Sequence, residues 1–373
     1  MDLINPPSSS IYIIAEAGVN HNGSIDLAKK LVEIAKQCGA NAVKFQSFKA
    51  SSLACKNAPK AAYQQKTTTS SESQFEMLTR LELNENDHHV LNQYANERSI
   101  DFLSSPFDLS SVALLTERLA LPRLKIPSGQ ITHAPLLLAA ASSGLPLIVS
   151  TGMATLGEIE ASLGVIAFGY TERELPPSSQ TFRSAYESTK GQAALQQLVT
   201  LLHCTSEYPT PYQDANLRAM DSLRHAFGLP VGLSDHTEGI AVALAAAARG
   251  ATVIEKHFTV DKSLPGPDHQ ASVDPNQLNE LVQSIRQIEL SLQRPGRKLT
   301  MPSEHQNRDV VRQSLVANTK IKKGDPFTPI NLGVKRPGTG ISPFMYWNYL
   351  GEIADRDYEV DEQISKRLQE VQS

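Results

Sequence analysis

The sequence has few cysteines, no excess of basic residues and no long apolar run. Its three cysteines, Cys38, Cys55 and Cys204, form no CxxC motif, cannot all pair and lack the local setting of a nucleophile, which favours a reducing compartment. The formal charge of −4 leaves no basic surface of the kind that nucleic acid requires. The apolar run 11–15 ends at Glu16, and no basic segment precedes it. We therefore expect a cytoplasmic protein without a signal peptide or a membrane span.

The length of the chain leaves space for more than one domain. With 373 residues, of which 40% are hydrophobic, the chain can bury a large core. It exceeds the roughly 250 residues that are typical of one α/β barrel. No G-x-G-x-x-G motif follows the first apolar run, so the usual signature of a dinucleotide-binding open sheet is missing.

Short apolar, β-prone runs alternate with segments that favour helix through most of the chain. The expected strands are 11–15, 42–45, 100–103, 124–126, 147–149, 198–203 and the apolar parts of 229–236 and 251–257. An Ala-rich helical run, 240–248, separates the last two. Eight such units predict an α/β fold, namely a (β/α)8 TIM barrel, better than an open doubly wound sheet.

The chain changes character after the last of these helices. We expect a barrel domain over residues 1–292, a polar linker over 293–310 and a small, glycine-rich β module over 311–373. Within the barrel, a polar loop is expected at 49–73. The segment 171–191 lacks periodicity and is interpreted as a surface excursion.

Polar residues stand at or just past the carboxyl end of each expected strand. They are Glu16, Lys44, Gln46, Ser105, Lys125, Ser128, Gln130, Ser150, Thr205, Tyr208, His236 and His257. In a barrel these ends share one rim, where TIM-barrel chemistry is found. Either histidine alone is more typical of a hydrogen-bonded side chain near a strand end, but the equivalent placement of His236 and His257 favours two neutral imidazoles that hold a divalent metal.

Two lysines and several hydroxyls on this rim suit a ligand that carries phosphate and carboxylate groups. Single serines such as Ser128 and Ser150 are also typical turn caps. Lys44 lies inside an apolar strand, where a lysine is expected only if it faces the mouth of the barrel. Glu16, which ends the first strand, is the best candidate for a general acid or base.

A series of motifs in the same order resembles the N-acetylneuraminate (sialic acid) synthase family. They are Ala15-Glu-Ala-Gly-Val-Asn-His-Asn-Gly23, Val43-Lys-Phe-Gln46, Ser105-Pro-Phe107, Lys125-Ile-Pro-Ser-Gly129, Ser150-Thr-Gly-Met153, Leu202-His-Cys-Thr205, Tyr208-Pro-Thr-Pro-Tyr212, Gly232-Leu-Ser-Asp-His-Thr237, Glu255-Lys-His-Phe258 and Pro265-Gly-Pro-Asp268. The C-terminal module, with Val334-Lys-Arg-Pro-Gly-Thr-Gly340, resembles the antifreeze-like (SAF) domain of those synthases. The resemblance runs from about residue 11 to the C-terminus.

The resemblance implies a TIM barrel that condenses phosphoenolpyruvate with an N-acetylated hexose into a nine-carbon 2-keto sugar acid and phosphate. It implies a divalent cofactor, with manganese expected, held by His236 and His257, and Glu16 as the catalytic carboxylate. The residues implied for phosphoenolpyruvate are Lys44, Gln46, Ser105, Lys125, Ser128 and Ser150. Those implied for the sugar are Gln130, Tyr208, Asp268 and Arg336.

In this family the SAF domain reaches the barrel of a partner subunit, so the resemblance implies a homodimer. N-acetylmannosamine is the first choice of sugar. A 2,4-diacetamido-6-deoxy hexose leading to legionaminic or pseudaminic acid is second, because Gln130 stands where many members have glutamate. Two other classes are a Schiff-base aldolase that uses Lys125 and a non-catalytic sugar-binding protein.

Overall fold

The computed structural model describes residues 10–61, 64–65, 72–172, 174–294 and 296–365. The N-terminal segment 1–9 and part of the predicted loop 49–73 lie outside the described residues. The chain divides into two compact units, Met1–Pro295 and Gly296–Ser373, which are considered separately. None of the described helices is both long and apolar enough to cross a membrane.

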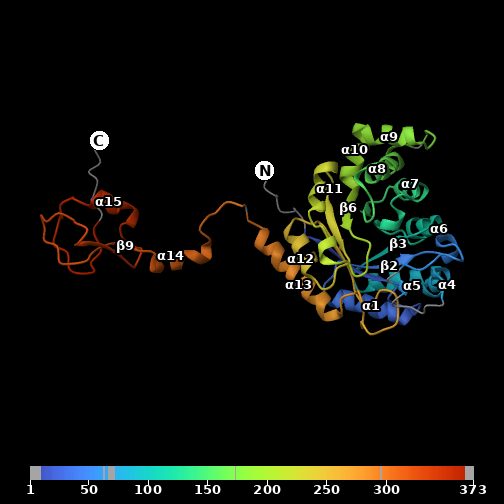
Figure 1. Ribbon diagram of the computed structural model, residues 1–373, viewed down its shortest axis with the longest axis horizontal. Coiled ribbons are helices and arrows are strands. Elements are labelled where there is room, and N and C mark those ends of the chain that lie inside the picture. The colour runs from blue at the N-terminus through green and yellow to red at the C-terminus, as the bar shows by residue number, and fades with distance from the viewer. Residues whose placement is uncertain (1–9, 62–63, 66–71, 173, 295, 366–373) are drawn as a thin grey trace. The chain divides into compact units, whose positions relative to one another are not determined.

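The larger unit is built on one sheet of eight parallel strands. These are β1 (Tyr12–Gly18), β2 (Ala42–Ser47), β3 (Asp101–Pro106), β4 (Leu124–Ile126), β5 (Leu147–Ser150), β6 (Val199–Cys204), β7 (Val231–Asp235) and β8 (Val253–His257). Their hydrogen-bonded order is β3-β2-β1-β8-β7-β6-β5-β4. β3 and β4, at the two ends of this order, lie in contact, so the sheet closes into the predicted (β/α)8 barrel (Figure 1).

Helices surround the sheet and begin where the sequence signals them. They are α1 (Ile25–Gln37), α2 (Ala50–Leu53), α4 (Gln74–Leu81), α5 (Glu85–Glu97), α6 (Leu109–Ala113), α7 (Ala134–Ser142), α8 (Leu156–Thr171), α9 (Ser179–Glu187), α10 (Thr189–Leu198), α11 (Ala219–Phe227), α12 (Ala241–Ala248) and α13 (Pro275–Leu292). Ser24 caps α1, Thr155 forms a capping box with Glu158 at α8, and Asp274 caps α13. These caps satisfy backbone N–H groups that have no partner inside the helix.

The first three strands continue beyond their apolar runs. β1 extends to Gly18, β2 to Ser47 and β3 to Pro106. Glu16 is paired in register with Lys44, and Gln46 with Ser105, so the polar residues belong to the ladders. A strand that points polar groups into a barrel mouth does not stop at its first polar residue, which is why the sequence interpretation ended these strands early.

The barrel interior is layered. Its apolar layer consists of Ile14, Ala42, Leu103, Ile148, Leu202 and Val253, all buried. Residues two positions further along a strand face the same side. In these strands they are Glu16, Lys44, Ser105, Ser150, Cys204 and Glu255. A polar and charged layer therefore lies directly above the apolar one.

The segment 171–191 is helical rather than irregular, which corrects the sequence interpretation. It contains α9 and the start of α10, and Ser178 caps α9. α9 packs so closely on α8 that a side chain at Gly164 would meet the carbonyl oxygen of Phe182 at 3.1 Å. Because α9 covers the outer side of α8, the residues of α8 between 162 and 169 are all buried, and α8 shows no division into an apolar and a polar face.

The smaller unit has a core of its own and little regular structure. Its strands are β9 (Ser314–Ala317) and β10 (Leu332–Lys335), which are antiparallel, and its helices are α14 (His305–Val311) and α15 (Tyr346–Tyr349). Buried side chains of this core are Leu315, Ala317, Ile321, Phe327, Leu332, Ile341, Ala354, Tyr358 and Ile364. α14 begins inside the predicted polar linker, so part of that segment is helical.

Candidate active site

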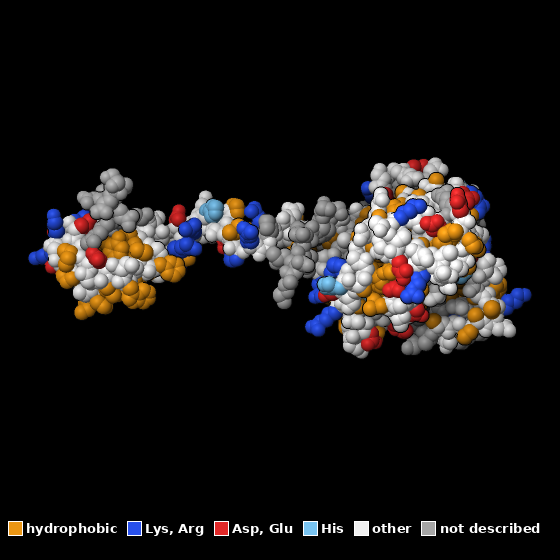
Figure 2. All heavy atoms as spheres, turned by 90° about the horizontal axis from the view of Figure 1, so that it is seen from above, with side chains coloured by type: hydrophobic (Ala, Val, Ile, Leu, Met, Phe, Trp, Pro, Cys, Tyr) orange, Lys and Arg blue, Asp and Glu red, His pale blue; other side chains and the backbone are white. Residues whose placement is uncertain are grey.

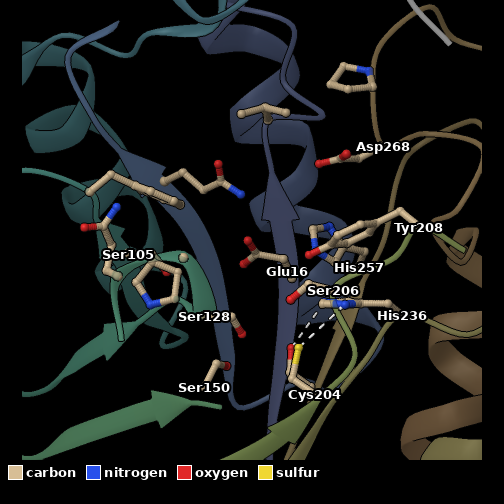
Figure 3. A pocket seen from close by; sticks show the side chains of 18 of the residues that line it. Glu16, Ser105, Ser128, Ser150, Cys204, Ser206, Tyr208, His236, His257 and Asp268 are labelled. Atoms are coloured by element: carbon tan, nitrogen blue, oxygen red, sulfur yellow. Dashed lines mark hydrogen bonds between the residues drawn. The ribbon is translucent and has the colours of Figure 1, made fainter. Parts of the chain in front are cut away.

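A pocket of about 480 Å³ opens at the carboxyl ends of the barrel strands. It brings together every predicted site residue of the larger unit, namely Glu16, Lys44, Gln46, Ser105, Lys125, Ser128, Gln130, Ser150, Tyr208, His236, His257 and Asp268. In Figure 3, Ser105, Ser128 and Ser150 lie on one side of Glu16, and Tyr208 and the two histidines lie on the other. The site is therefore assembled from many strands.

Two cations and two anions are buried together at the base of the pocket. Lys44 Nζ lies 2.7 Å from Glu16 Oε2 and 3.7 Å from Glu255 Oε2. Lys125 Nζ lies 3.0 Å from Glu255 Oε1. None of the four side chains is more than 5% exposed. An unpaired charge at this depth would be strongly destabilising, so each ion depends on its neighbours.

The two carboxylates differ in their ionisation. Burial raises the pKa of Glu16 to about 7, although Lys44 opposes the shift. Burial also acts against ionisation of Glu255, but Lys125 and Lys44 outweigh it and hold the pKa of Glu255 well below its usual range. Glu16 can therefore exchange a proton near neutral pH, whereas Glu255 stays charged.

Hydroxyl groups complete the side of the pocket opposite the histidines. Ser105 Oγ accepts a hydrogen bond from Lys44 Nζ at 3.0 Å, and Ser128 Oγ accepts one from the backbone N–H of Gly152 at 3.0 Å. Among the described residues, the buried Ser150 hydroxyl has no hydrogen-bond partner. Buried hydroxyls rarely stay unpaired, so Ser150 is available to a ligand.

His236 and His257 face each other with ring centroids 5.4 Å apart, and the Tyr208 ring lies against both. His236 Nδ1 donates to the carbonyl oxygen of Thr205 at 2.7 Å, so the lone pair of the neutral ring is on Nε2, which lies 3.4 Å from Ser234 Oγ. Burial lowers the pKa of His257 well below its usual value, and its Nδ1 has no partner among the described residues. The pair therefore offers nitrogen donors.

These donors fit a first-row divalent ion, which imidazole nitrogen binds well. Within the part of the chain that the structure describes, no group of three or more His, Cys, Asp or Glu side chains is arranged to hold a metal. The two histidines would therefore supply part of a coordination sphere, and substrate oxygens or water would have to supply the rest. Asp268 lies in the same pocket, and burial raises its pKa to about 6.

The pocket also contains residues that the sequence analysis missed. Ser234 and Glu255 lie two positions before His236 and His257 and face the interior with them. Cys204 Sγ lies 3.7 Å from His236 Nδ1. Burial acts to raise the pKa of this thiol, but His236 and other neighbours lower it to about 7. Because residues two positions apart in a strand face the same side, the inward direction of His236 and His257 also predicts an inward direction for Ser234 and Glu255.

One side of the pocket is apolar. Its residues come from the mouth of the barrel and from α2 and α4, and they are Val19, Leu53, Met77, Leu78, Leu81 and Phe107. Met77 and Leu81 are buried against Val19 and Phe48, so this apolar wall is packed rather than loose. The pocket therefore combines a charged base with an apolar wall.

Arg336, the remaining predicted site residue, lies in the smaller unit just after β10 and is exposed. It lines a groove with Arg308, Arg312 and Phe344. Three guanidinium groups make this groove suitable for an acidic partner surface or a polar ligand.

A closed parallel barrel with paired, buried charges and two imidazoles at the carboxyl ends of its strands is the architecture of a (β/α)8-barrel enzyme. The chain belongs to the NeuB family, whose sequence profile matches residues 31–296.

Three similar proteins align over most of the chain. An N,N'-diacetyllegionaminic acid synthase from Campylobacter jejuni is 50% identical over 94% of this chain and 98% of its own length. A second enzyme of that name, from Legionella pneumophila, is 47% identical over 93% of this chain and 92% of its own length. The crystal structure of N-acetylneuraminic acid (sialic acid) synthetase from Leptospira borgpetersenii in complex with citrate is 30% identical, with a TM-score of 0.64, and covers 82% of this chain and 94% of that one.

We expect Glu16→Gln to remove a pH dependence of stability. The folded state holds the Glu16 proton up to a pKa of about 7, whereas the unfolded chain loses it near pH 4.3, its usual value. The stabilisation from this proton is complete below the unfolded pKa and is lost as the pH rises through about 7. From pH 6 to pH 8 the wild type should lose stability on the order of 1 kcal/mol relative to the variant. Thermal unfolding of both proteins measures this, and parallel curves would contradict it.

Proposed function

We propose that this protein is a nonulosonic acid synthase that condenses phosphoenolpyruvate with a 2,4-diacetamido-6-deoxy hexose to give a legionaminic-type acid and phosphate. The observation that carries this proposal is the identity of 50% and 47% with two N,N'-diacetyllegionaminic acid synthases. The sialic acid synthetase of known structure is 30% identical. These relatives favour the second choice of sugar from the sequence analysis over N-acetylmannosamine.

The charged base of the pocket suits the enol phosphate. Lys44 and Lys125 provide two ammonium groups, and Ser105, Ser128 and Ser150 provide directed hydroxyls around them. Phosphate and carboxylate oxygens are recognised by such donors. With Gln46, these residues form the proposed phosphoenolpyruvate site.

The apolar wall suits the deoxy sugar. A 6-deoxy hexose ends in a methyl group and carries two acetamido methyls, and the partly exposed Leu53 and Leu78 offer apolar surface to such groups. Gln130 can donate and accept hydrogen bonds with an amide of the sugar. Tyr208 and Asp268 lie on the side of the histidines and complete the proposed sugar site.

Glu16 is the proposed acid and base of the reaction. C3 of the enol phosphate attacks the aldehyde carbon of the open sugar, water adds at C2, and phosphate leaves from the resulting tetrahedral carbon. A divalent ion held by His236 and His257, with manganese as first choice, would act as a Lewis acid toward the aldehyde oxygen. Because its pKa of about 7 lies near the working pH, Glu16 can take a proton in one step and return it in another.

A substrate panel tests the proposed function. Phosphate release from phosphoenolpyruvate should be fastest with the 2,4-diacetamido-6-deoxy hexose of manno configuration, and we expect kcat/KM for N-acetylmannosamine to be lower by about 10-fold to 100-fold. The altro-configured isomer, which leads to pseudaminic acid, is the stereochemical control. Faster turnover of N-acetylmannosamine would make the protein a sialic acid synthase, and no phosphate release with any sugar would contradict the proposal as a whole.

The metal assignment has its own test. His236→Ala and His257→Ala should each bind less Mn²⁺ after dialysis against a metal buffer, because each removes one of two nitrogen donors. Metal content measured by elemental analysis gives a readout that does not depend on activity. His225→Ala, on an exposed face of α11, is the matched control. Unchanged metal content in both pocket variants would remove the histidines from the metal site.

We further propose that the smaller unit acts in trans within a homodimer, as an SAF domain. Its surface supports an interaction function, since Ile330, Phe344 and Trp347 are 80%, 92% and 77% exposed. Figure 2 shows hydrophobic side chains gathered on the surface of this unit. Arg336 would then contact the acetamido carbonyl of a sugar bound in the partner's barrel.

Mixing two impaired variants, at a sugar concentration below the raised KM, tests this arrangement. Arg336→Ala should raise the KM for the sugar by about 10-fold and leave metal and phosphoenolpyruvate binding unchanged, because it removes one charged hydrogen bond. A mixture of Arg336→Ala and Glu16→Gln should regain part of the activity, since a heterodimer can assemble one intact site. Confirmed subunit exchange without any recovery would show that the unit serves its own barrel or none.

A further inference from the structure

The proposed function leaves Glu255 without a role. Glu255 lies on β8, is 2% exposed and belongs to the charged layer that forms the base of the pocket. As a charged side chain, Glu255 adds nothing to an apolar core. A carboxylate buried at this depth lowers the stability of the fold unless its charge is paired with neighbouring cations.

The contacts of Glu255 link three residues from three other strands. Its Oε1 accepts hydrogen bonds from Lys125 Nζ at 3.0 Å and from Ser234 Oγ at 2.8 Å. Its Oε2 accepts no hydrogen bond from the described residues and lies 3.7 Å from Lys44 Nζ. One carboxylate therefore stands between two ammonium groups that would otherwise repel each other.

Of the two lysines, Lys125 depends more on a contact from another strand to hold its side chain in place. It sits in the middle of β4, which has only three residues and pairs in register with β5 alone. β4 is an end strand in the hydrogen-bonded order. A lysine side chain also has many rotamers to lose on ordering. The ion pair with Glu255, 130 residues away in the chain, is the contact that directs its ammonium group into the pocket.

We propose that Glu255 is a positioning residue for the enol phosphate site. It fixes Lys125 and Ser234 and sets the spacing between the ammonium groups of Lys125 and Lys44, so that together they receive one ligand with two anionic groups. The inference rests on the proposed function, because it takes phosphoenolpyruvate to be that ligand. Glu255 acts through its neighbours and takes no proton in the reaction.

Glu255→Gln is the first test. It keeps the shape of the side chain but replaces one carboxylate oxygen with a donor that faces an ammonium group. We expect the Kd and KM for phosphoenolpyruvate to rise by roughly 10-fold to 100-fold, as for loss of a charged hydrogen bond, while the sugar KM changes by less than about twofold. A purely structural role would instead lower the active fraction and leave both KM values unchanged. Glu117→Gln, exposed on the same unit, is the matched control.

A double-mutant cycle with Lys125→Met shows through which residue Glu255 acts. If Glu255 acts mainly by positioning Lys125, the loss of phosphoenolpyruvate binding in the double variant should be well below the sum of the two single losses, because the main group to be positioned is already gone. Fully additive losses would overturn the proposal. If Glu255→Gln does not fold, Glu255→Asp replaces it. Aspartate keeps the charge but is too short to hold Lys125 and Ser234 together, so a raised phosphoenolpyruvate KM is again expected.

Calorimetric titration of the full-length protein with phosphoenolpyruvate distinguishes a wrong substrate assignment from a wrong role for Glu255. If the wild type does not bind phosphoenolpyruvate, the proposed function is wrong. If the wild type binds it and Glu255→Gln binds it equally well, the proposed function stands and the positioning inference is overturned. Weaker binding by the variant, measured at a temperature at which circular dichroism shows it to be fully folded, supports the inference.

Discussion

The mutual neutralisation of buried charges is the constraint on which the site depends. Glu16, Lys44, Lys125 and Glu255 come from four strands, and none of them is stable at this depth without the others. The barrel supplies the geometry, since its closure brings β4 and β8 to opposite sides of one small interior. The apolar layer beneath, with Ile14 and Leu202, keeps water from reaching these ions from below.

This charge network also argues against the Schiff-base alternative from the sequence analysis. A nucleophilic lysine needs a neutral amine. Lys125 Nζ instead donates to the Glu255 carboxylate at 3.0 Å, so its nitrogen is engaged in a buried ion pair. A simple sugar-binding protein, in turn, would have no use for a carboxyl group with a pKa of about 7 beside a buried lysine.

The sequence predicted the barrel and most of the pocket because both follow from local patterns. Each apolar run marked a strand, and the polar residue at its end marked the rim, as at Glu16 and His257. Glu255 and Ser234 were missed because they lie inside the runs, where only the alternation of side chains reveals their direction. The contact between Lys125 and Glu255 depends on barrel closure over 130 residues, which no local pattern encodes. The same holds for the apolar wall, since nothing in the sequence of α4 shows which opening Met77 covers.

The pairing of each lysine in the pocket with a carboxylate bears on product release in the proposed reaction. Each ammonium group of the pocket already has a buried carboxylate partner, at 2.7 Å for Lys44 and 3.0 Å for Lys125. Such a group gains less from holding inorganic phosphate than an unpaired cation would, because the resident carboxylate competes for it. In the proposed reaction, the same ion pairs that make the buried site stable would therefore also ease the departure of phosphate.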